Sequence, residues 1–338
     1  MLRIDGSYGE GGGQILRTAL SLSAILKIPF EIYNIRKGRK KPGLLAQHLT
    51  SVNAVAKICN AEVSGNTFGS THLTFIPGEI KPGEYEFNVA TERGSAGSVT
   101  LVAQSLIPIL LTTKSRVIIK GGTHVPFSPP FDYLAEVLLP FLRRYGYNVE
   151  AKIFQYGFFP IGRGSIVIDF KPSSNIKTVP TITERGKLKK LSLISRVANL
   201  PRTIAERQAS HFLRLLRIDF PQIEIEQITD EIRAACPGTY LFLKAEYENI
   251  IAGFSSLGAK GKPAETVAEE VYQEFKSYLL SERGVFDRHL ADQICIFLAK
   301  QNISNITINT NKITEHLKTN IWTIQQFLPS FKPVVLPV

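Results

Sequence analysis

Apolar positions along the chain follow two spacings, one that suits helices and one that suits strands. After a glycine-rich turn at residues 9–13, residues 15–26 (ILRTALSLSAIL) form an apolar run long enough for a buried helix. The run PFEIYNIR that follows is rich in β-branched and aromatic residues, which predicts a strand. A second helix over residues 43–59 and a strand near residues 61–63 complete a first unit.

The same order of elements recurs twice. A second copy has a glycine turn at residues 94–97 and helices over residues 98–111 and 131–145; a third has a helix after Gly284 and another over residues 316–327. In each copy the second helix comes about 30 to 35 residues after the glycine turn, which favours internal repetition over the alternation common to all α/β proteins. Three such units are expected to bury one large core around shared helices.

One segment breaks this rhythm. Residues 184–279 begin with a charged run and then predict a strand, a helix, three further strands and a closing helix, as in a small α+β domain. The sequence therefore predicts an α/β (α+β) protein with a large domain, residues 1–183 and 280–338, of three repeated two-helix, four-strand units. Residues 184–279 form the small inserted domain, and a cleft between the two domains is a natural ligand site.

Composition limits the class of protein. Of the 338 residues 44% are hydrophobic, yet no apolar run reaches the roughly 18 residues that span a membrane. The polar, glycine-rich start predicts no secretory signal. Three cysteines, far apart and in no ligand spacing, suit a reducing compartment better than a disulfide frame or a zinc site. We therefore expect a cytoplasmic protein without a membrane partner; its oligomeric state is not predicted.

Positive charge is the strongest compositional bias. The net charge is +11, with 40 Lys and Arg against 29 Asp and Glu, and such a surface attracts nucleic acid, nucleotides or anionic lipid. Since many basic proteins bind no polyanion, the charge alone leaves both alternatives open. Residues 36–41 (RKGRKK) concentrate five cations in a strand-to-helix loop. This loop either binds phosphate through its arginines or is simply solvated.

The GEGGGQ loop and two later polar positions are candidates for nucleotide chemistry. Glycines before a helix let an anion approach its N-terminus, Glu10 in that loop offers a hard oxygen to a divalent cation, and Arg17 lies one turn further on. The alternative is a tight turn that only caps the helix. Asp292 and Gln293 could recognise a base or hydroxyls, or Asp292 could merely complement the helix dipole. Gln104, in the most apolar helix, must find either ligand or backbone as a partner.

Among the six histidines, one is best placed for catalysis. His316 stands at the start of a helix after a strand, where a neutral imidazole can attack phosphorus. Thr319 and Asn320 follow it and could orient the ring or contact phosphate. Most histidines in proteins are structural, so the residues alone leave this assignment open.

Seven blocks of sequence form an ordered set that spans nearly the whole chain, including the inserted segment. They are DGSYGEGGGQILRTALSLS, RKGRKKPGLLAQHLT, GSVTLVAQSLIPILL, GGTHVPFSPPFDYL, GFSSLGAKGKPAE, HLADQ and EHLKTN. Together they resemble the RNA 3′-terminal phosphate cyclase family. The resemblance implies three repeated units, related in fold to the C-terminal domain of a bacterial translation initiation factor, and a thioredoxin-like inserted domain.

The same resemblance implies a reaction and its residues. ATP, as co-substrate with Mg²⁺ or Mn²⁺, adenylates a histidine; the AMP then passes to an RNA 3′-phosphate end, and the 2′-hydroxyl displaces it to leave a 2′,3′-cyclic phosphate. By position, the nucleophile is His316 and the metal carboxylate is Glu10. The implied nucleotide-binding positions are Gln104, His289, Leu290, Ala291, Asp292 and Gln293. The implied contacts to the RNA terminal phosphate are Arg17, Arg36, Arg39 and Gln47.

The sequence departs from the family pattern at two places, and three other functions compete with this interpretation. Where the family tends to have a glycine triplet this chain has Gly162-Arg163-Gly164, and His289 stands where Tyr is frequent, which leaves base stacking and the RNA path open. A cyclase-like branch of the same fold lacks the histidine and acts in ribosome assembly; His316 in an intact HLKTN run argues against it. A carboxyvinyl transferase fits the nucleotide blocks poorly, and a plain RNA-binding module does not explain the buried polar residues.

Overall fold

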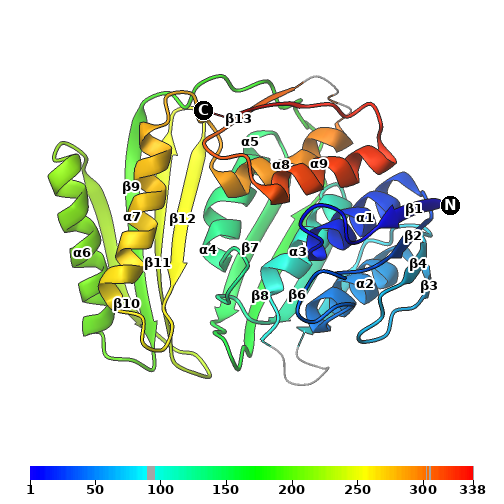
Figure 1. The fold of residues 1–338 in the computed structure, drawn as a ribbon, viewed down its shortest axis with the longest axis horizontal. Coiled ribbons are helices and arrows are strands. Elements are labelled where there is room, and N and C mark those ends of the chain that lie inside the picture. The colour runs from blue at the N-terminus through cyan, green and yellow to red at the C-terminus, as the bar shows by residue number, and fades with distance from the viewer. Residues whose placement is uncertain (90–95, 302, 304–305, 338) are drawn as a thin grey trace.

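The predicted strands group into four sheets in the computed structural model, which describes residues 1–89, 96–301, 303 and 306–337 (Figure 1). The first unit runs in the order β1 (Leu2–Asp5), α1 (Gly13–Leu26), β2 (Phe30–Tyr33), α2 (Ala46–Cys59), β3 (Glu62–Ser64) and β4 (Leu73–Ile76). Its strand order is β1-β2-β4-β3, with β1 parallel to β2 and β4 antiparallel to both neighbours.

The second unit repeats this topology. Its elements are β5 (Glu84–Asn88), α3 (Val99–Leu110), β6 (Ser115–Gly121), α4 (Phe131–Tyr133), the π-helix η2 (Leu134–Leu138), α5 (Leu139–Arg144), β7 (Asn148–Gln155) and β8 (Gly164–Lys171). The order β5-β6-β8-β7 has the same parallel and antiparallel pairs as the first sheet, which confirms the repetition. Gly94 of the predicted turn lies outside the described residues.

The helix predicted over residues 131–145 is interrupted. It consists of α4 and α5 with η2 between them. A continuous α-helix would need a hydrogen bond from the N–H of residue 140 to the carbonyl of Glu136, but Pro140 has no N–H. The helix therefore adopts a wider, π-helical turn just before Pro140. The widened turn places Leu138 at the pocket described below.

The third unit keeps the helices but has a smaller sheet. It comprises α8 (Arg288–Lys300), β13 (Thr307–Thr310), α9 (Glu315–Phe327) and β14 (Val334–Pro337). β13 pairs in parallel with β14, and Phe286 makes a parallel bridge to Thr310. Within the described residues this unit therefore has two strands and a bridge where four strands were expected.

The fourth sheet comes from the predicted insertion. Its strands are β9 (Leu188–Ala198), β10 (Ile225–Ile232), β11 (Gly238–Tyr247) and β12 (Ile251–Leu257), in the order β10-β9-β11-β12. The helices α6 (Thr203–Asp219) and α7 (Ala264–Leu280) pack on each other and on this sheet, at the left of Figure 1. Domain boundaries at residues 184 and 279 and a likeness to thioredoxin stay predictions.

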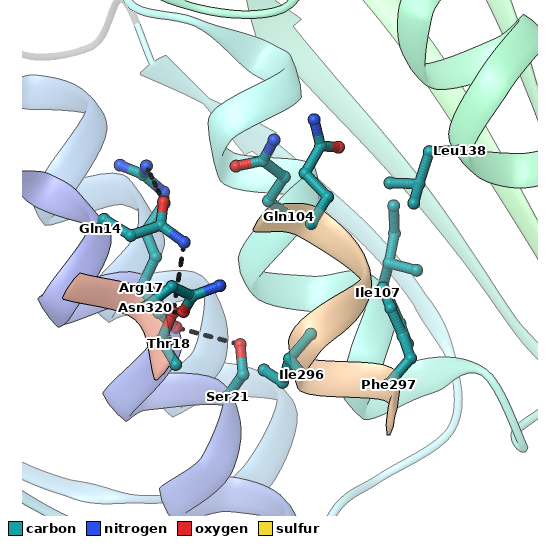
Figure 2. A pocket seen from close by; sticks show the side chains of 11 residues that line it. Gln14, Arg17, Thr18, Ser21, Gln104, Ile107, Leu138, Ile296, Phe297 and Asn320 are labelled. Atoms are coloured by element: carbon teal, nitrogen blue, oxygen red, sulfur yellow. Dashed lines mark hydrogen bonds between the residues drawn. The ribbon is translucent and has the colours of Figure 1, made fainter. Parts of the chain in front are cut away.

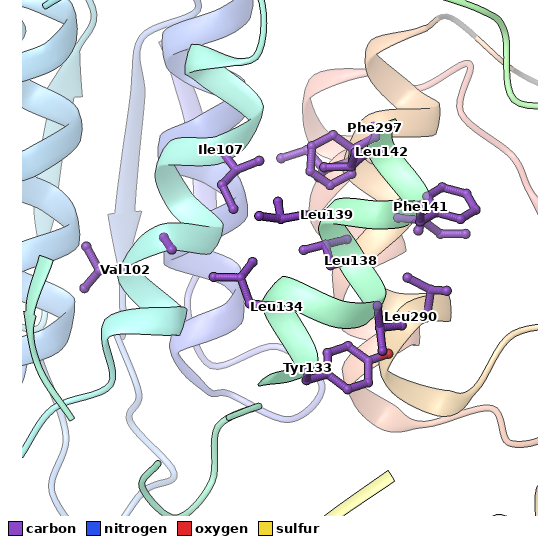
Figure 3. Close-up of a cluster of buried hydrophobic side chains, with 14 of the residues drawn as sticks. Val102, Ile107, Tyr133, Leu134, Leu138, Leu139, Phe141, Leu142, Leu290 and Phe297 are labelled. Carbon is purple, nitrogen blue, oxygen red and sulfur yellow. The ribbon is translucent and has the colours of Figure 1, made fainter. Parts of the chain in front are cut away.

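Helices of the three units meet in the middle of the larger part of the molecule. α1 contacts α2, α3 and α9, and α3 also contacts α8. Ile107 of α3, Leu138 of η2 and Phe297 of α8 belong to one buried cluster (Figure 3). Each such side chain contributes about 1.5–3 kcal/mol on burial, which fixes the helices that carry the candidate site. Among the described residues no helix has the length and apolar content to cross a membrane.

Candidate active site

The GEGGGQ loop lies directly on the first turns of α9. Gly9 has φ +54, and a Cβ there would approach Thr319 Oγ1 to 2.4 Å, so only glycine lets the loop come this close. The backbone N–H of Glu10 donates to Thr319 Oγ1 at 3.2 Å. Residues 309 positions apart in sequence are therefore held together at the start of α1.

His316 and Glu10 form an ion pair at this junction. The Thr314 side chain caps α9 by accepting from the Leu317 N–H, which places His316 in the first turn with its side chain 53% exposed. Its Nε2 lies 2.8 Å from Glu10 Oε2, and Arg39 contacts the other oxygen of the same carboxylate.

The pair shifts both groups towards their charged forms. Pairing with the Glu10 carboxylate raises the pKa of His316 above its ordinary value, against a smaller opposing effect of burial. Burial acts to raise the pKa of Glu10, but His316 and Arg39 together outweigh it, so this pKa lies below its ordinary value. An imidazolium has no free lone pair, so only the neutral form of such a ring can act as a nucleophile.

Two opposite charges flank the pair: Arg17 is buried, and Asp292 is half-buried with its Oδ1 enclosed. Burial lowers the pKa of Arg17 to about 10, although the charges of Asp292 and Glu10 oppose this shift. Burial likewise raises the pKa of Asp292 to about 6. Arg17 Nε and Asp292 Oδ1 are buried atoms without a hydrogen-bond partner among the described residues. Such atoms are expensive to bury unless a ligand satisfies them.

A narrow pocket opens among the central helices beside this cluster (Figure 2). Its polar walls come from all three units: Arg17 from α1, Gln104 from α3, Gln293 from α8 and Asn320 from α9. Apolar side chains such as Ile107 close its other side. Arg17 belongs both to the pocket and to the charged cluster, so the two form one continuous site.

A chain of hydrogen bonds joins α1, α9 and α8 at the pocket. Thr18 Oγ1 donates to Asn320 Oδ1 at 2.7 Å, and Asn320 Nδ2 donates to the Asp292 backbone oxygen at 2.9 Å. Gln14 Oε1 accepts from Arg17 Nη2 at 2.9 Å (Figure 2). Sequence reasoning missed Gln14 and Thr18, although their spacing of four residues on one helix face was a usable signal.

Two further predicted residues, Arg36 and Gln47, form hydrogen bonds to backbone groups. Arg36 Nη1 donates to the carbonyls of Lys41 and Gly43 within its own loop. Gln47 Oε1 accepts from the Ser98 N–H at 3.1 Å, ahead of α3.

The predicted nucleotide block at the start of α8 divides into an accessible part and a buried part. His289 packs edge-on against Tyr133, with ring centroids 5.7 Å apart. Leu290 and Ala291 are fully buried core residues, so neither presents a surface to a ligand. The carboxylate of Asp287 caps α8 by accepting from the N–H groups of His289 and Leu290.

For the expected divalent cation, Glu10 is the carboxylate available at this site. Among the described residues no group of three or more His, Cys, Asp or Glu side chains could hold a metal. Mg²⁺, however, is commonly held by one or two carboxylates together with substrate phosphates. Glu10, with its pKa below the ordinary value and Arg17 and Arg39 nearby for phosphate, fits that arrangement.

Comparison with known proteins identifies the fold. The RNA 3′-terminal phosphate cyclase family matches residues 8–331. The chain belongs to the RNA 3′-terminal phosphate cyclase family. A curated relative of that name from Gloeothece citriformis (strain PCC 7424) is 44% identical over 335 residues, which cover 97% of this chain and 93% of the relative. Relatives of the same name from Pyrococcus furiosus (43% identical; 97% and 93% covered) and Salmonella agona (39%; 97% and 92%) show that the likeness spans distant organisms. The protein is thus an enzyme of the cyclase family.

Proposed function

We propose that this enzyme uses ATP to convert an RNA 3′-phosphate into a 2′,3′-cyclic phosphate through an adduct of AMP with His316. The observation that carries the proposal is the half-exposed His316 imidazole, held beside Glu10 next to a pocket whose wall includes Arg17, with its unsatisfied buried Nε. A nucleophile, cations for phosphate and a partly apolar cavity for a base are the parts that nucleotidyl transfer needs.

Three displacements at phosphorus follow in this proposal. The His316 nitrogen bonds the α-phosphorus of ATP while the bond to the bridging oxygen breaks and pyrophosphate leaves. An oxygen of the RNA 3′-phosphate then bonds the same phosphorus, and the P–N bond breaks to give RNA(3′)pp(5′)A. Finally the 2′-hydroxyl loses its proton and bonds the RNA phosphorus, and AMP leaves. AMP is a better leaving group than a bare phosphate oxygen, which explains the need for adenylation.

The surrounding residues are assigned by their chemistry. Arg17 and Arg39 are placed to bind phosphate, and the free Nε of Arg17 gains a partner when they do. Asp292, Gln104 and Gln293 are proposed to bind the nucleoside through hydroxyl and base atoms. Mg²⁺ or Mn²⁺ on Glu10 would supply charge neutralisation to the phosphates.

Three other predicted positions have supporting roles in the proposal. Arg36 and Gln47 would contact the RNA phosphate through side-chain N–H donors that the hydrogen bonds described above do not use. His289 would border the base, from its position against Tyr133.

One labelling experiment tests the adenylation step. Incubation with α-labelled ATP and Mg²⁺ should label the protein through an acid-labile phosphoramidate, and His316→Ala should take up none. Label on the His316→Ala variant would overturn the assignment. Conversion of an RNA 3′-phosphate into a phosphatase-resistant end then tests cyclisation itself, and RNA binding without either product would indicate a non-catalytic cyclase-like protein.

A further inference from the structure

Two aromatic rings stack at the surface beside the candidate active site. The rings of Tyr8 and Trp322 lie 3.8 Å apart between centroids and 11° from parallel. Tyr8 is still 46% exposed although Trp322 covers one of its faces. The other face of Tyr8 is therefore open to solvent, in a protein that otherwise buries most of its large aromatic residues.

The stack is fixed to the reacting groups on both sides. Tyr8 precedes Glu10 by two residues, and Trp322 lies on α9, six residues after His316. At about 1.5 Å per residue this places Trp322 about 9 Å from His316 along the helix axis. Tyr8 lies two residues from Glu10, which pairs with His316, so a phosphate at His316 and a ring on Tyr8 are within the reach of two adjacent nucleotides.

The loop that carries Tyr8 is ordered by its own hydrogen bonds. The Tyr8 carbonyl accepts from the Gly11 N–H at 2.8 Å. Asp5 Oδ1 accepts from both the Ser7 N–H and the Ser7 hydroxyl, and Asn34 donates to it as well. The ring is therefore presented in place, and little conformational entropy is lost when another ring stacks on it.

Positive charge accompanies the aromatic face. The loop at residues 36–41 contributes five cations, of which Arg39 reaches Glu10. Proteins that bind single-stranded nucleic acid combine such a cationic track with aromatic side chains on which bases stack. RNA ends are recognised by the same device, since their unstacked bases are free to leave the strand.

We propose that the open face of Tyr8, backed by Trp322, is a stacking platform for a base within the last two nucleotides of the RNA substrate. This inference rests on the proposed function, which brings an RNA 3′-phosphate to His316. Stacking on an aromatic face is tolerant of base identity, so the platform positions any RNA end rather than selecting a sequence. It is separate from the pocket between the central helices, where the nucleoside of ATP is proposed to bind.

A cycle of protein and RNA changes tests the platform. Tyr8→Ala should raise the KM for an RNA 3′-phosphate roughly tenfold, whereas Tyr8→Phe stays near wild type. An abasic nucleotide at one of the last two positions should raise the wild-type KM by the same factor and add nothing in Tyr8→Ala. Phe154→Ala removes another exposed aromatic ring, which is 66% exposed on β7, and serves as the matched control.

Two further variants keep this result interpretable. Since Tyr8→Ala uncovers Trp322, a base could stack there instead, and the double variant Tyr8→Ala/Trp322→Leu removes that possibility. Self-adenylation from ATP should stay at the wild-type level in Tyr8→Ala. A parallel loss of adenylation would show that Tyr8 only supports the Glu10 loop, and an unchanged KM, or an abasic penalty equal in both proteins, would likewise overturn the platform.

The chain's single tryptophan provides a readout independent of catalysis. In the His316→Asn variant, which cannot turn over, titration with RNA 3′-phosphate should change Trp322 fluorescence, with roughly tenfold weaker binding when Tyr8→Ala is added. If the wild type fails to adenylate but the two His316→Asn proteins differ in RNA binding as expected, the platform is supported and the proposed reaction is wrong. If adenylation occurs and both proteins bind RNA equally, the reaction stands and the platform falls; no binding at all overturns the platform.

Discussion

Two histidine–carboxylate pairs in this molecule have nearly the same length but opposite surroundings. His316 Nε2 lies 2.8 Å from Glu10 Oε2, and His124 Nε2 lies 2.7 Å from Asp132 Oδ2. The His316 side chain is 53% exposed and that of His124 is fully buried. A distance alone therefore does not separate a reactive histidine from a structural one.

The partners around each pair make the distinction. Thr123 bonds the second ring nitrogen of His124, and Tyr240 donates to the second oxygen of Asp132 at 3.1 Å, with Arg196 at 3.9 Å. Both ring nitrogens of His124 and both oxygens of Asp132 thus have partners, although the neighbouring Arg196 Nε has no hydrogen-bond partner among the described residues. Arg196 and Tyr240 belong to the fourth sheet, so the pair joins that sheet to the second unit. The pair at Glu10 instead borders buried polar atoms without partners. Completed bonding indicates a structural connection, and incomplete bonding indicates a ligand site.

The largest expected effect is a loss of adenylation activity, which distinguishes His316 from His124. His316→Ala should reduce adenylation to less than about a thousandth of wild type, because no other group supplies the nucleophile. Its thermal stability should hardly change, since the side chain is half exposed and Arg39 still pairs with Glu10. Labelling with α-labelled ATP and a melting curve check both statements. A labelled His316→Ala protein, or one that unfolds far more easily, would reverse the comparison.

The second effect concerns stability. His124→Ala should lower the free energy of unfolding by about 3–5 kcal/mol, because it leaves the buried Asp132 carboxylate without its partner. His72→Ala is the matched control: His72 also pairs with a carboxylate, Glu31, at 2.7 Å, but at the surface, and its loss should cost less than about 1 kcal/mol. Urea unfolding measures both, and equal losses would show that burial does not determine the strength of these pairs.

The same pair predicts how stability depends on acid. Burial acts to raise the pKa of Asp132, but bonding to His124, with smaller effects of Arg196 and Tyr240, outweighs it and holds this pKa below the ordinary value. The stabilisation is therefore present above the ordinary aspartate pKa of the unfolded chain and is lost as the pH falls through the lower native value. His124→Ala should weaken this acid-dependent loss of stability, which urea unfolding across the acid range measures.

Much of the fold was predictable because local signals agreed with it. Apolar runs of helical length and β-branched strands located the elements of the repeated units, and equal spacing indicated the repetition. The π-turn at Leu134–Leu138 was not predicted, since apolar periodicity does not reveal how one proline changes the backbone bonding. The smaller third sheet was missed because strand pairing is a long-range property that a local pattern does not contain.

The candidate site divides in the same way. His316, Glu10, Arg17 and Asp292 were named from residue type and family resemblance, and the structure brings them together. Their mutual pairing was not predictable from the chain. Leu290 shows the opposite case: it belongs to a functional-looking block, yet its side chain is buried in the core.

A smaller effect is expected at Asp292. Burial raises its pKa to about 6, so the folded protein binds an extra proton between the ordinary aspartate pKa and that value. Stability from this group is therefore highest in acid and declines as the pH rises towards and beyond 6. Asp292→Asn should raise the free energy of unfolding at pH 7 by at most about 3 kcal/mol and should reduce adenylation. Urea unfolding at pH 4 and pH 7 checks the sign; a variant that is less stable at pH 7 would show that attraction to Arg17 outweighs burial.

The smallest change, and the most informative about chemistry, is Glu10→Gln. Because pairing with Glu10 raises the pKa of His316, the variant should titrate His316 at lower pH than wild type. Histidine NMR without nucleotide or metal measures this shift independently of any role of Glu10 as a metal ligand. Glu315→Gln is the control, since Glu315 neighbours His316 on α9 but pairs with Lys318. Attack on ATP needs neutral imidazole, so the acid limb of adenylation should follow the NMR pKa to lower pH. If the pKa stays in place, Glu10 and His316 are neighbours without functional coupling, and the contrast with the buried pair rests on exposure alone.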